Sequence, residues 1–299
     1  MTSWKGKTRG GLAGYKIFIS ILRKLGLPFA YLVLKFVVVY FIITSPKSFR
    51  CTFLYFRRIL KHNFLSSLIM ILKNYYIFGQ VLLDKISVLA NFPNTFTYDF
   101  DGEENLRKIV KEKKGGVLIS LHIGNWEIAG QLLERLEARI NIVMLNNDYQ
   151  KIKTLLDNTY MKKNVNFIAI KDDFSHLFAV KNALQNKEII AIHGDRYIPG
   201  TKTIKCKFLG KDALFPSGPL YLASKYSVPV SFVSAMKETD KHYHFFASAP
   251  KTYSYPANLK TRNTKLKAMI EEYISHAENI LRKYPLQWFN YYLFWESYK

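Results

Sequence analysis

The feature that most constrains this chain is the long apolar run LGLPFAYLVLKFVVVYFIIT, from Leu25 to Thr44. As a helix rising about 1.5 Å per residue, the run is about long enough to cross the hydrocarbon core of a bilayer. Pro28 lies near its start, where a helix tolerates proline, and Lys35 in its middle makes full spanning costly. The run predicts a helical membrane anchor, spanning or half-inserted, with a buried helix of a soluble protein as the alternative.

Basic residues surround this run and dominate the whole chain. The 299 residues carry 44 Lys and Arg against 22 Asp and Glu, a formal net charge of +22. The first hundred residues hold 14 of those basic residues and only two acids, Asp84 and Asp99. Such a charge favours an anionic partner. Bases that interrupt apolar runs suit an anionic membrane surface, whereas nucleic-acid domains present a polar basic face, so we expect no nucleic-acid partner.

Composition excludes several other classes. With only 2 cysteines, Cys51 and Cys206, the chain is neither a disulfide-rich scaffold nor a multi-cysteine zinc module. An apolar share of 49% is too high for a disordered basic tail. The length suits one large domain or two small ones.

After about residue 100 the pattern changes to short β-rich runs that alternate with helical stretches. This alternation is typical of an α/β domain with a mainly parallel sheet, whose sites lie at the carboxyl ends of its strands. We therefore expect a basic, hydrophobic, helical membrane-anchoring region over residues 1–100 and an α/β domain over residues 101–299. The first region should also hold a helix starting at Ser45-Pro46 and a long apolar helix over residues 64–89. In the second region the expected strands are 117–121, 140–145, 165–170, 189–193, 228–235 and 243–249, and the expected helices are 104–113, 126–136, 150–163, 175–186, 219–226 and 265–283.

The motif with the clearest chemistry is HIGNWE, which follows the expected strand 117–121. It puts His122 at the carboxyl end of a strand and Glu127 in the first turn of the next helix, with Gly124 to let the backbone turn. A neutral imidazole takes a proton from an alcohol or amine, and a carboxylate on its other nitrogen fixes the tautomer. The pattern predicts a His122–Glu127 general-base dyad; a capped helix with a stray histidine is the alternative. No G-x-S-x-G elbow is present, and Ser120 keeps a serine role open, although direct attack by the acceptor is favoured.

Five other residues bear on chemistry. His193 lies two residues before Asp195 on one strand, so the two face one way, and His193 is either a buried, hydrogen-bonded histidine or part of a site. Arg196 suits fork-like binding of a carboxylate or phosphate, or a surface ion pair. His242 and His244 alternate in a strand; no third ligand cluster lies near them in the sequence, so an exposed strand face is favoured over a metal site.

Further sequence blocks accompany the histidine motif in a consistent order. They are IIAIHGDR at 189–196, CKFLG at 206–210, FPSGPLYLA at 215–223 and PLQW at 285–288. Together with LHIGNWE at 121–127 and the hydrophobic N-terminal run, they span most of the chain. These blocks resemble those of the late acyltransferases of lipid A biosynthesis, the lauroyl and myristoyl transferases, a lysophospholipid-acyltransferase-like family.

The resemblance implies a glycerolipid-acyltransferase-like α/β fold, with a mainly parallel mixed sheet flanked by helices and an N-terminal hydrophobic helical anchor. It implies transfer of a fatty acyl chain from a thioester, on acyl carrier protein or acyl-CoA, to a hydroxyl of a lipid A precursor or related glycolipid. The expected place is the cytoplasmic face of a bacterial inner membrane, with no metal and no cofactor. His122 would be the general base and Glu127 its partner. The residues expected to line the site are Asn125, Trp126, Asp195, Arg196, Pro216 and Gly218.

Some positions depart from that family. Arg196 stands where many members have Gln, and the opening W-x-G-x-T-R-G resembles a subgroup encoded near aryl polyene or flexirubin pigment genes. A pigment precursor or an aminolipid is therefore an alternative acceptor. Backbone N–H groups after Gly124, or Arg196, are candidates to stabilise an oxyanion. A basic peripheral membrane-binding protein is the non-enzymatic alternative, and it leaves the His122 motif without a use.

Overall fold

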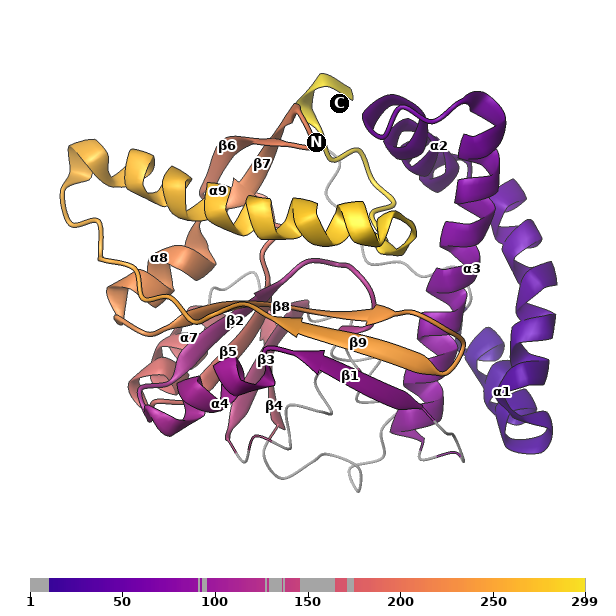
Figure 1. The fold of residues 1–299 in the computed structure, drawn as a ribbon, viewed down its shortest axis with the longest axis horizontal. Coiled ribbons are helices and arrows are strands. Elements are labelled where there is room, and N and C mark those ends of the chain that lie inside the picture. Colours follow the sequence, from indigo (N-terminus) through magenta and orange to yellow (C-terminus); the bar gives the residue numbers. More distant parts are fainter. Residues whose placement is uncertain are drawn as a thin grey trace.

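The computed structural model describes residues 11–90, 92, 96–126, 128, 136, 138–145, 165–170 and 175–298. In this part of the chain a seven-stranded sheet lies between helices, and the helices of the first ninety residues stand together at one end of it (Figure 1). The expected helices 126–136 and 150–163 fall largely or wholly outside the described residues.

The large sheet has the strand order β1-β9-β8-β2-β5-β3-β4. Every neighbouring pair is parallel except β8 and β9, which are antiparallel. The prediction of a mainly parallel mixed sheet flanked by helices is therefore confirmed. The strands are β1 (Thr97–Asp101), β2 (Gly116–Ser120), β3 (Ile140–Leu145), β4 (Val165–Ile170), β5 (Ile189–His193), β8 (Val230–Lys237) and β9 (His242–Ala247).

Strand β1 was not predicted from the sequence, because it is an edge strand that alternates polar and aromatic residues. Its sequence TYDFD exposes Thr97, Asp99 and Asp101 and turns only Tyr98 and Phe100 inward. Charged residues on an outer strand discourage pairing with another sheet edge, and they also conceal the strand in a search for apolar runs.

Helices cover both faces of the sheet. On one face lie α7 (Ser175–Gln185), α8 (Gly218–Lys225) and α9 (Leu259–Lys283), and their apolar residues join the largest core cluster. Helix α4 (Glu103–Lys111) lies on the other face, where its Ile109 packs with Leu118 of β2. Helix α9 starts earlier than predicted, because the Asn258 side chain caps it by accepting a hydrogen bond from the Lys260 N–H at 2.9 Å.

A second, two-stranded antiparallel sheet of β6 (Thr203–Phe208) and β7 (Lys211–Pro216) stands beside α9 (Figure 1). The two turn residues, Leu209 and Gly210, both have positive φ, as a tight hairpin turn requires. Neither strand of this hairpin was predicted from the sequence.

The N-terminal helices form a layered group. Helix α1 (Gly11–Thr44) has a kink at Gly26, with φ of 76°, so Pro28 lies in the first turn after the kink. Helices α2 (Pro46–Leu54) and α3 (Phe64–Leu89) follow, and a short π-helical turn, η1 (Tyr55–Ile59), ends α2. Helices α1 and α3 approach closely at Gly79, which has no side chain. A side-chain carbon there would lie 2.5 Å from Leu34.

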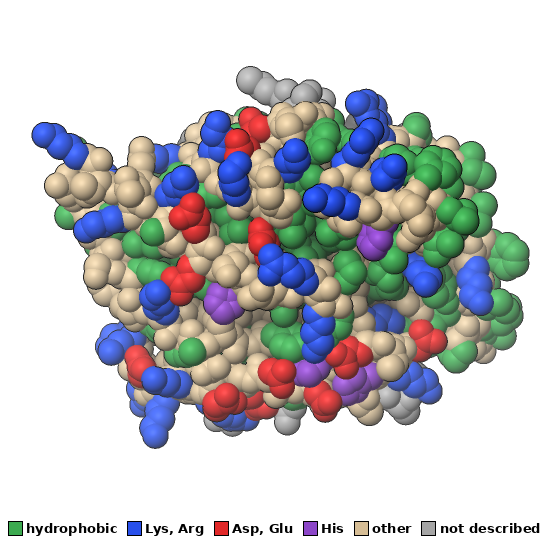
Figure 2. All heavy atoms as spheres, turned by 45° about the horizontal axis from the view of Figure 1, so that its top comes forward, with side chains coloured by type: hydrophobic (Ala, Val, Ile, Leu, Met, Phe, Trp, Pro, Cys, Tyr) green, Lys and Arg blue, Asp and Glu red, His purple; other side chains and the backbone are tan. Residues whose placement is uncertain are grey.

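The outer surface of this group is apolar (Figure 2). Within the described residues, the segments Lys16–Thr44 and Phe64–Val88 are long and apolar enough to cross a membrane. Only 28% and 33% of their most apolar windows are buried in the protein, so they are not core helices of the ordinary kind. The large exposed apolar side chains here are Ile17, Leu25, Phe29, Leu32, Phe36, Val39, Tyr40, Ile43, Phe64, Leu65, Ile69 and Leu72.

A buried ion pair joins these helices to the sheet. Asp84 of α3 is fully buried, and its carboxylate accepts a hydrogen bond from the Lys237 ammonium of β8 at 2.6 Å. The hydroxyls of Tyr31 in α1 and Tyr243 in β9 also donate to Asp84. Burial lowers the pKa of Lys237, while the charge of Asp84 opposes that shift. One carboxylate thus binds α1, α3 and two strands together.

We predict that Lys237→Met lowers the free energy of unfolding by about 3–5 kcal/mol, because Asp84 is left buried without its cation. The double variant Asp84→Asn with Lys237→Met should recover much of that loss, since no buried charge remains. Denaturant unfolding in detergent, followed by circular dichroism, measures both. Equal stability of Lys237→Met and wild type would show that the pair does not secure α3.

Candidate active site

The site is built on the parallel pairing of β2 with β5. Ser120 at the end of β2 is paired with His193 at the end of β5. His122 and Asp195 each lie two residues after that pair. Side chains two residues apart on a strand point to the same face, so His122 and Asp195 lie side by side where the two strands end. The Gly194 N–H donates to the Ser120 carbonyl at 2.8 Å and continues the ladder into this loop.

His122 and Asp195 form two hydrogen bonds. The His122 Nδ1 lies 2.8 Å from Asp195 Oδ1, and the His122 main-chain N–H donates to Asp195 Oδ2 at 3.1 Å. The Asp195 side chain is 1% exposed and that of His122 is 24% exposed. A carboxylate on Nδ1 assigns the proton to that nitrogen, so Nε2 is the nitrogen that can act as a base.

The Asp195 carboxyl is held in its charged form. Burial by itself would raise its pKa, but the charge and hydrogen bond of His122, followed by Arg196, hold the pKa below its ordinary value. A buried carboxylate of this kind stabilises a positive charge on the histidine ring.

The turn after His122 is fixed by the backbone around it. Gly124 has φ of 60°, and a side-chain carbon there would lie 2.0 Å from the Ala235 carbonyl oxygen. Only glycine fits that position. The Gly124 N–H donates to the Gln287 carbonyl at 3.0 Å, and the Asn125 N–H donates to the Ala235 carbonyl at 2.8 Å. Of the candidate oxyanion donors after Gly124, the Asn125 N–H is therefore already used by a carbonyl.

Asn125 is fully buried and connects the turn to the ion-pair cluster. Its side-chain amide donates to the Tyr243 hydroxyl and to the Val81 carbonyl of α3, both at 3.2 Å. Its side-chain oxygen accepts from the Ile128 N–H at 3.2 Å, which caps the helical segment that begins at Trp126. Asn125 therefore fixes the turn to α3 and β9 through its buried side chain. Glu127, the expected partner of His122, lies outside the described residues.

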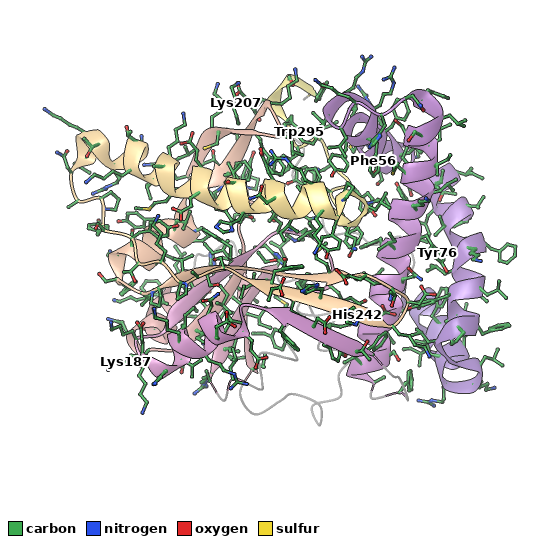
Figure 3. The ribbon with its side chains drawn as sticks, in the orientation of Figure 1. Phe56, Tyr76, Lys187, Lys207, His242 and Trp295 are labelled. Atoms are coloured by element: carbon green, nitrogen blue, oxygen red, sulfur yellow. The ribbon has the colours of Figure 1, made fainter. Side chains whose placement is uncertain are left out.

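The C-terminal segment closes over the same turn. Phe289 N–H donates to the His122 carbonyl at 3.1 Å, and Trp288 forms an isolated bridge with Ile123. The segment continues to Trp295, which is labelled in Figure 3 and whose ring is stacked on that of Tyr55 with centres 6.3 Å apart. The Trp295 indole N–H donates to the Phe208 carbonyl at 2.8 Å. The sequence block PLQW was noticed, but its contact with the histidine turn was not predicted.

Arg196 follows directly on Asp195 and is held by that C-terminal segment. Its Nη2 donates to the Phe289 carbonyl at 3.2 Å, and its guanidinium lies 5.7 Å from the centre of the Tyr292 ring. The Tyr292 hydroxyl in turn donates to the Asp195 carbonyl at 3.3 Å. A cation is thus fixed beside the His122–Asp195 pair.

Pro216 and Gly218 lie at the end of β7 and the start of α8. Their neighbour Phe215 contacts Tyr273 of α9, with ring centres 6.2 Å apart. The Tyr273 hydroxyl donates to the Ser120 carbonyl at 3.0 Å. These contacts support β2 from the side of α9. Tyr273 was not predicted from the sequence, because nothing in the local sequence distinguishes an aromatic residue that contacts the site from other aromatic residues of a long helix.

A mainly apolar cavity of about 360 Å³ lies between α9 and strands β2, β8 and β9. Its lining includes Leu121 and Ile123, the residues on either side of His122, but not His122 itself. Asp101, at the end of β1, and Glu104, at the start of α4, also line it. The cavity is therefore close to the candidate base in the chain, although it lies on the opposite side of β2 from the base.

Other candidates are placed differently. The Ser120 hydroxyl is buried and donates to the Leu121 carbonyl at 3.0 Å, which gives no nucleophile geometry. His242 and His244 lie on β9, between β1 and β8, where Asp101 is 3.2 Å and Glu238 is 3.3 Å from the His244 ring nitrogens. Neither histidine belongs to the group of potential metal ligands found among the described residues.

One group of potential metal ligands occurs among the described residues. His122, His193 and Asp195 each offer a donor atom, all within 4.8 Å of one another. The two histidine rings are stacked, however, with centres 4.1 Å apart and planes 29° apart. In-plane lone pairs of stacked rings do not converge on one ion, so this arrangement suits proton transfer better than coordination.

Comparisons with known proteins identify similar chains. Residues 68–289 match the family model described as bacterial lipid A biosynthesis acyltransferase. The fold is similar to the crystal structure of the 1-acyl-sn-glycerophosphate acyltransferase PlsC from Thermotoga maritima, at 16% identity and a TM-score of 0.38. That similarity covers 83% of this chain and 97% of the PlsC chain. A search among curated proteins gave no match.

The lowered pKa of Asp195 leads to a stability prediction. A carboxyl whose pKa is lower in the folded protein stabilises it above the unfolded pKa, near 4, and that contribution is lost as pH falls toward the folded pKa. We expect the difference in free energy of unfolding between wild type and Asp195→Asn to be largest near pH 6 and to shrink below about pH 4. Denaturant titrations at several pH values measure it. A difference that does not vary with pH would contradict the pairing.

Proposed function

The chain belongs to the bacterial lipid A biosynthesis acyltransferase family, and on that premise we propose that it moves a fatty acyl chain from an acyl thioester to a hydroxyl of a lipid acceptor. Acyl transfer is the activity of the family; the donor, the acceptor and the roles of residues are our proposal. The observation that carries it is the Nδ1–Asp195 hydrogen bond, which gives His122 a defined tautomer at the end of a strand.

In the proposed reaction, His122 Nε2 takes the proton of the acceptor hydroxyl as its oxygen attacks the thioester carbonyl. The C–O bond forms, and a tetrahedral oxyanion results. When this collapses, the C–S bond breaks and His122 returns the proton to the leaving thiolate. Asp195 stabilises the imidazolium between those two steps, as the aspartate does in the Ser-His-Asp triad. No covalent acyl-enzyme is needed, which agrees with the buried, hydrogen-bonded Ser120.

Arg196 is our candidate for stabilising the oxyanion or a donor phosphate. It is the cation adjacent to the pair, and its orientation is restrained by Phe289 and Tyr292. The main-chain N–H groups of Gly124 and Asn125 are less suitable, because both already donate to carbonyls. A preorganised cation near the reacting carbonyl contributes most where water is excluded.

Two carboxylates are candidates for the dyad partner. Asp195 has the described hydrogen bond to Nδ1, whereas Glu127 is the partner that the family resemblance implies. We propose Asp195 as the residue that orients the ring and keep Glu127 as a second acid of the site. Trp126, at the start of the same helical segment, would line the acceptor side.

The apolar cavity under α9 is our candidate for the acyl chain. Its lining is mostly aliphatic and aromatic, as expected for a slot that binds methylene groups. Leu121 and Ile123 flank the base and line the cavity on the other side of β2, so an acyl chain bound there would pass the end of β2 to bring its carbonyl to His122.

The apolar outer surface of α1 and α3 and the charge of +22 suit a protein at an anionic membrane surface. We propose the cytoplasmic face of a bacterial inner membrane, where an acidic acyl carrier protein or acyl-CoA can reach the site. Lys16, Arg23, Lys24, Lys47 and Arg50 flank the apolar surface and would contact anionic lipid head groups.

Lipid mass spectrometry of the native host, with and without this gene, tests the acceptor. Loss of one acyl chain from a lipid A species supports a lipid A precursor or related glycolipid. Unchanged lipid A, with an acyl group lost from a pigment or aminolipid, moves the acceptor to that lipid and keeps the chemistry. No change in any lipid while the protein is expressed would contradict acyl transfer.

We predict that His122→Ala lowers kcat by about 10²–10⁴-fold, because the general base is removed. Binding to anionic vesicles should be unchanged, since His122 is not on the apolar surface. The kcat values of Glu127→Gln and Asp195→Asn, measured in the same assay, show which acid contributes more to activity. We expect the larger loss of kcat in Asp195→Asn. Wild-type activity in His122→Ala would exclude this histidine as the base.

The acyl-slot proposal predicts a change in chain-length preference. Ala277 and Ile280 of α9 both line the cavity. Ala277→Phe should shift the preferred donor to shorter chains, because the ring fills the slot, and Ile280→Ala should admit longer chains. Competition between donors of different lengths, read by product mass, measures both. If both variants keep the wild-type profile, the chain binds elsewhere.

A further inference from the structure

We propose that His193 is a positioning residue for acyl transfer: its neutral ring is the platform against which the His122 imidazole stacks. This inference rests on the proposed function of His122 as the general base. It gives a role to a histidine for which the sequence left two readings open.

The geometry places His193 directly against the base. The His122 and His193 ring centres are 4.1 Å apart, and their planes differ by 29°. His193 also meets the Trp126 ring edge-on, with centres 5.0 Å apart and planes at 85°. The ring of His193 thus contacts both the partly exposed base and Trp126. Asp195 restrains the edge of the His122 ring, and His193 restrains its face.

The position of His193 is itself restrained. It is the last residue of β5 and pairs in register with Ser120. Gly194 follows it, and a side-chain carbon there would lie 2.8 Å from Ile119 and 2.9 Å from Tyr273. The backbone beside the ring is therefore packed on the α9 side, and the platform cannot move without displacing β2 or α9.

His193 is suited to be the neutral member of the pair. Its Nδ1 is buried and has no hydrogen-bond partner among the described residues, and its ring donates to the Leu121 carbonyl. Burial and then the neighbouring His122 hold its pKa well below the ordinary value; Asp195 opposes this, and Arg196 adds to it. The transferred proton therefore goes to His122 alone. A neutral aromatic face beside the imidazolium stabilises that cation, as a ring does in a cation–π contact.

The proposed role depends on the aromatic face of His193 and not on its ring nitrogens, so substitutions can distinguish the two. His193→Phe keeps an aromatic face and should lose at most about threefold in kcat. His193→Leu removes the face and should lose about 10- to 30-fold, which corresponds to a desolvated cation–π contact. It should also move the acid limb of the kcat/KM profile to lower pH, because the imidazolium has lost a stabilising contact. The assay uses an acyl-carrier-protein donor and purified protein in detergent.

His244→Leu is the matched control. His244 is also a strand histidine stacked on an aromatic ring, with its centre 4.3 Å from that of Phe246, but it lies on β9. It should leave the acid limb in place. Thermal unfolding of each variant in the same detergent checks that the fold is retained. His193→Gln, which keeps a polar group of similar length but no ring, is used if the leucine variant does not fold.

The outcomes are distinct. Loss of activity in His193→Leu with a shifted acid limb, and retention in His193→Phe, supports the platform. Equal loss in the phenylalanine and leucine variants, with activity kept in His193→Gln, overturns it in favour of a hydrogen-bonding role for the ring nitrogens. Wild-type kinetics in His193→Leu also overturns it. An inactive wild-type protein, or a fully active His122→Ala, would instead remove the proposed function on which it rests.

Discussion

The parallel register between β2 and β5 is the constraint on which the site depends. It pairs Ser120 with His193, and the next step along both strands brings His122 beside Asp195. Neither side chain needs a long loop to reach the other, so little conformational entropy opposes their pairing. The position also agrees with the general rule that open α/β sheets carry their sites at the carboxyl ends of strands.

A second set of contacts holds that end of the sheet rigid. The C-terminal segment hydrogen-bonds to the histidine turn at Gly124 and His122, and it also orients Arg196. Asn125 links the same turn to Tyr243, whose hydroxyl donates to the buried carboxylate of Asp84. The histidine turn is therefore connected, through buried polar groups, to the helices that present the apolar surface. Groups of this kind persist in a core only when each has a partner, and here the partners come from distant parts of the chain.

The two halves of the molecule suit two kinds of substrate contact. The helical end offers exposed aliphatic and aromatic side chains with basic residues around them, as a lipid surface requires (Figure 2). The sheet end offers a histidine that is partly open to solvent, over a carboxylate that is not. The cavity under α9 is lined by the two residues that flank the histidine, on the other side of β2. Transfer of an acyl chain to a lipid would draw on all three features.

The sequence by itself determined the α/β class, the central strands and the apolar helices, and it made His122, Asp195 and Arg196 candidates for the site. These depend on local patterns: apolar runs, alternation of strand and helix, and short blocks at strand ends. It did not predict strand β1 or the β6–β7 hairpin, whose polar residues hide them. Only the tertiary structure decided that Asp195 bonds to His122, that His193 stacks beneath it, and that Phe289 closes over it. Those contacts join residues about 70 to 170 positions apart, and strand order and register, which no local pattern encodes, bring them together.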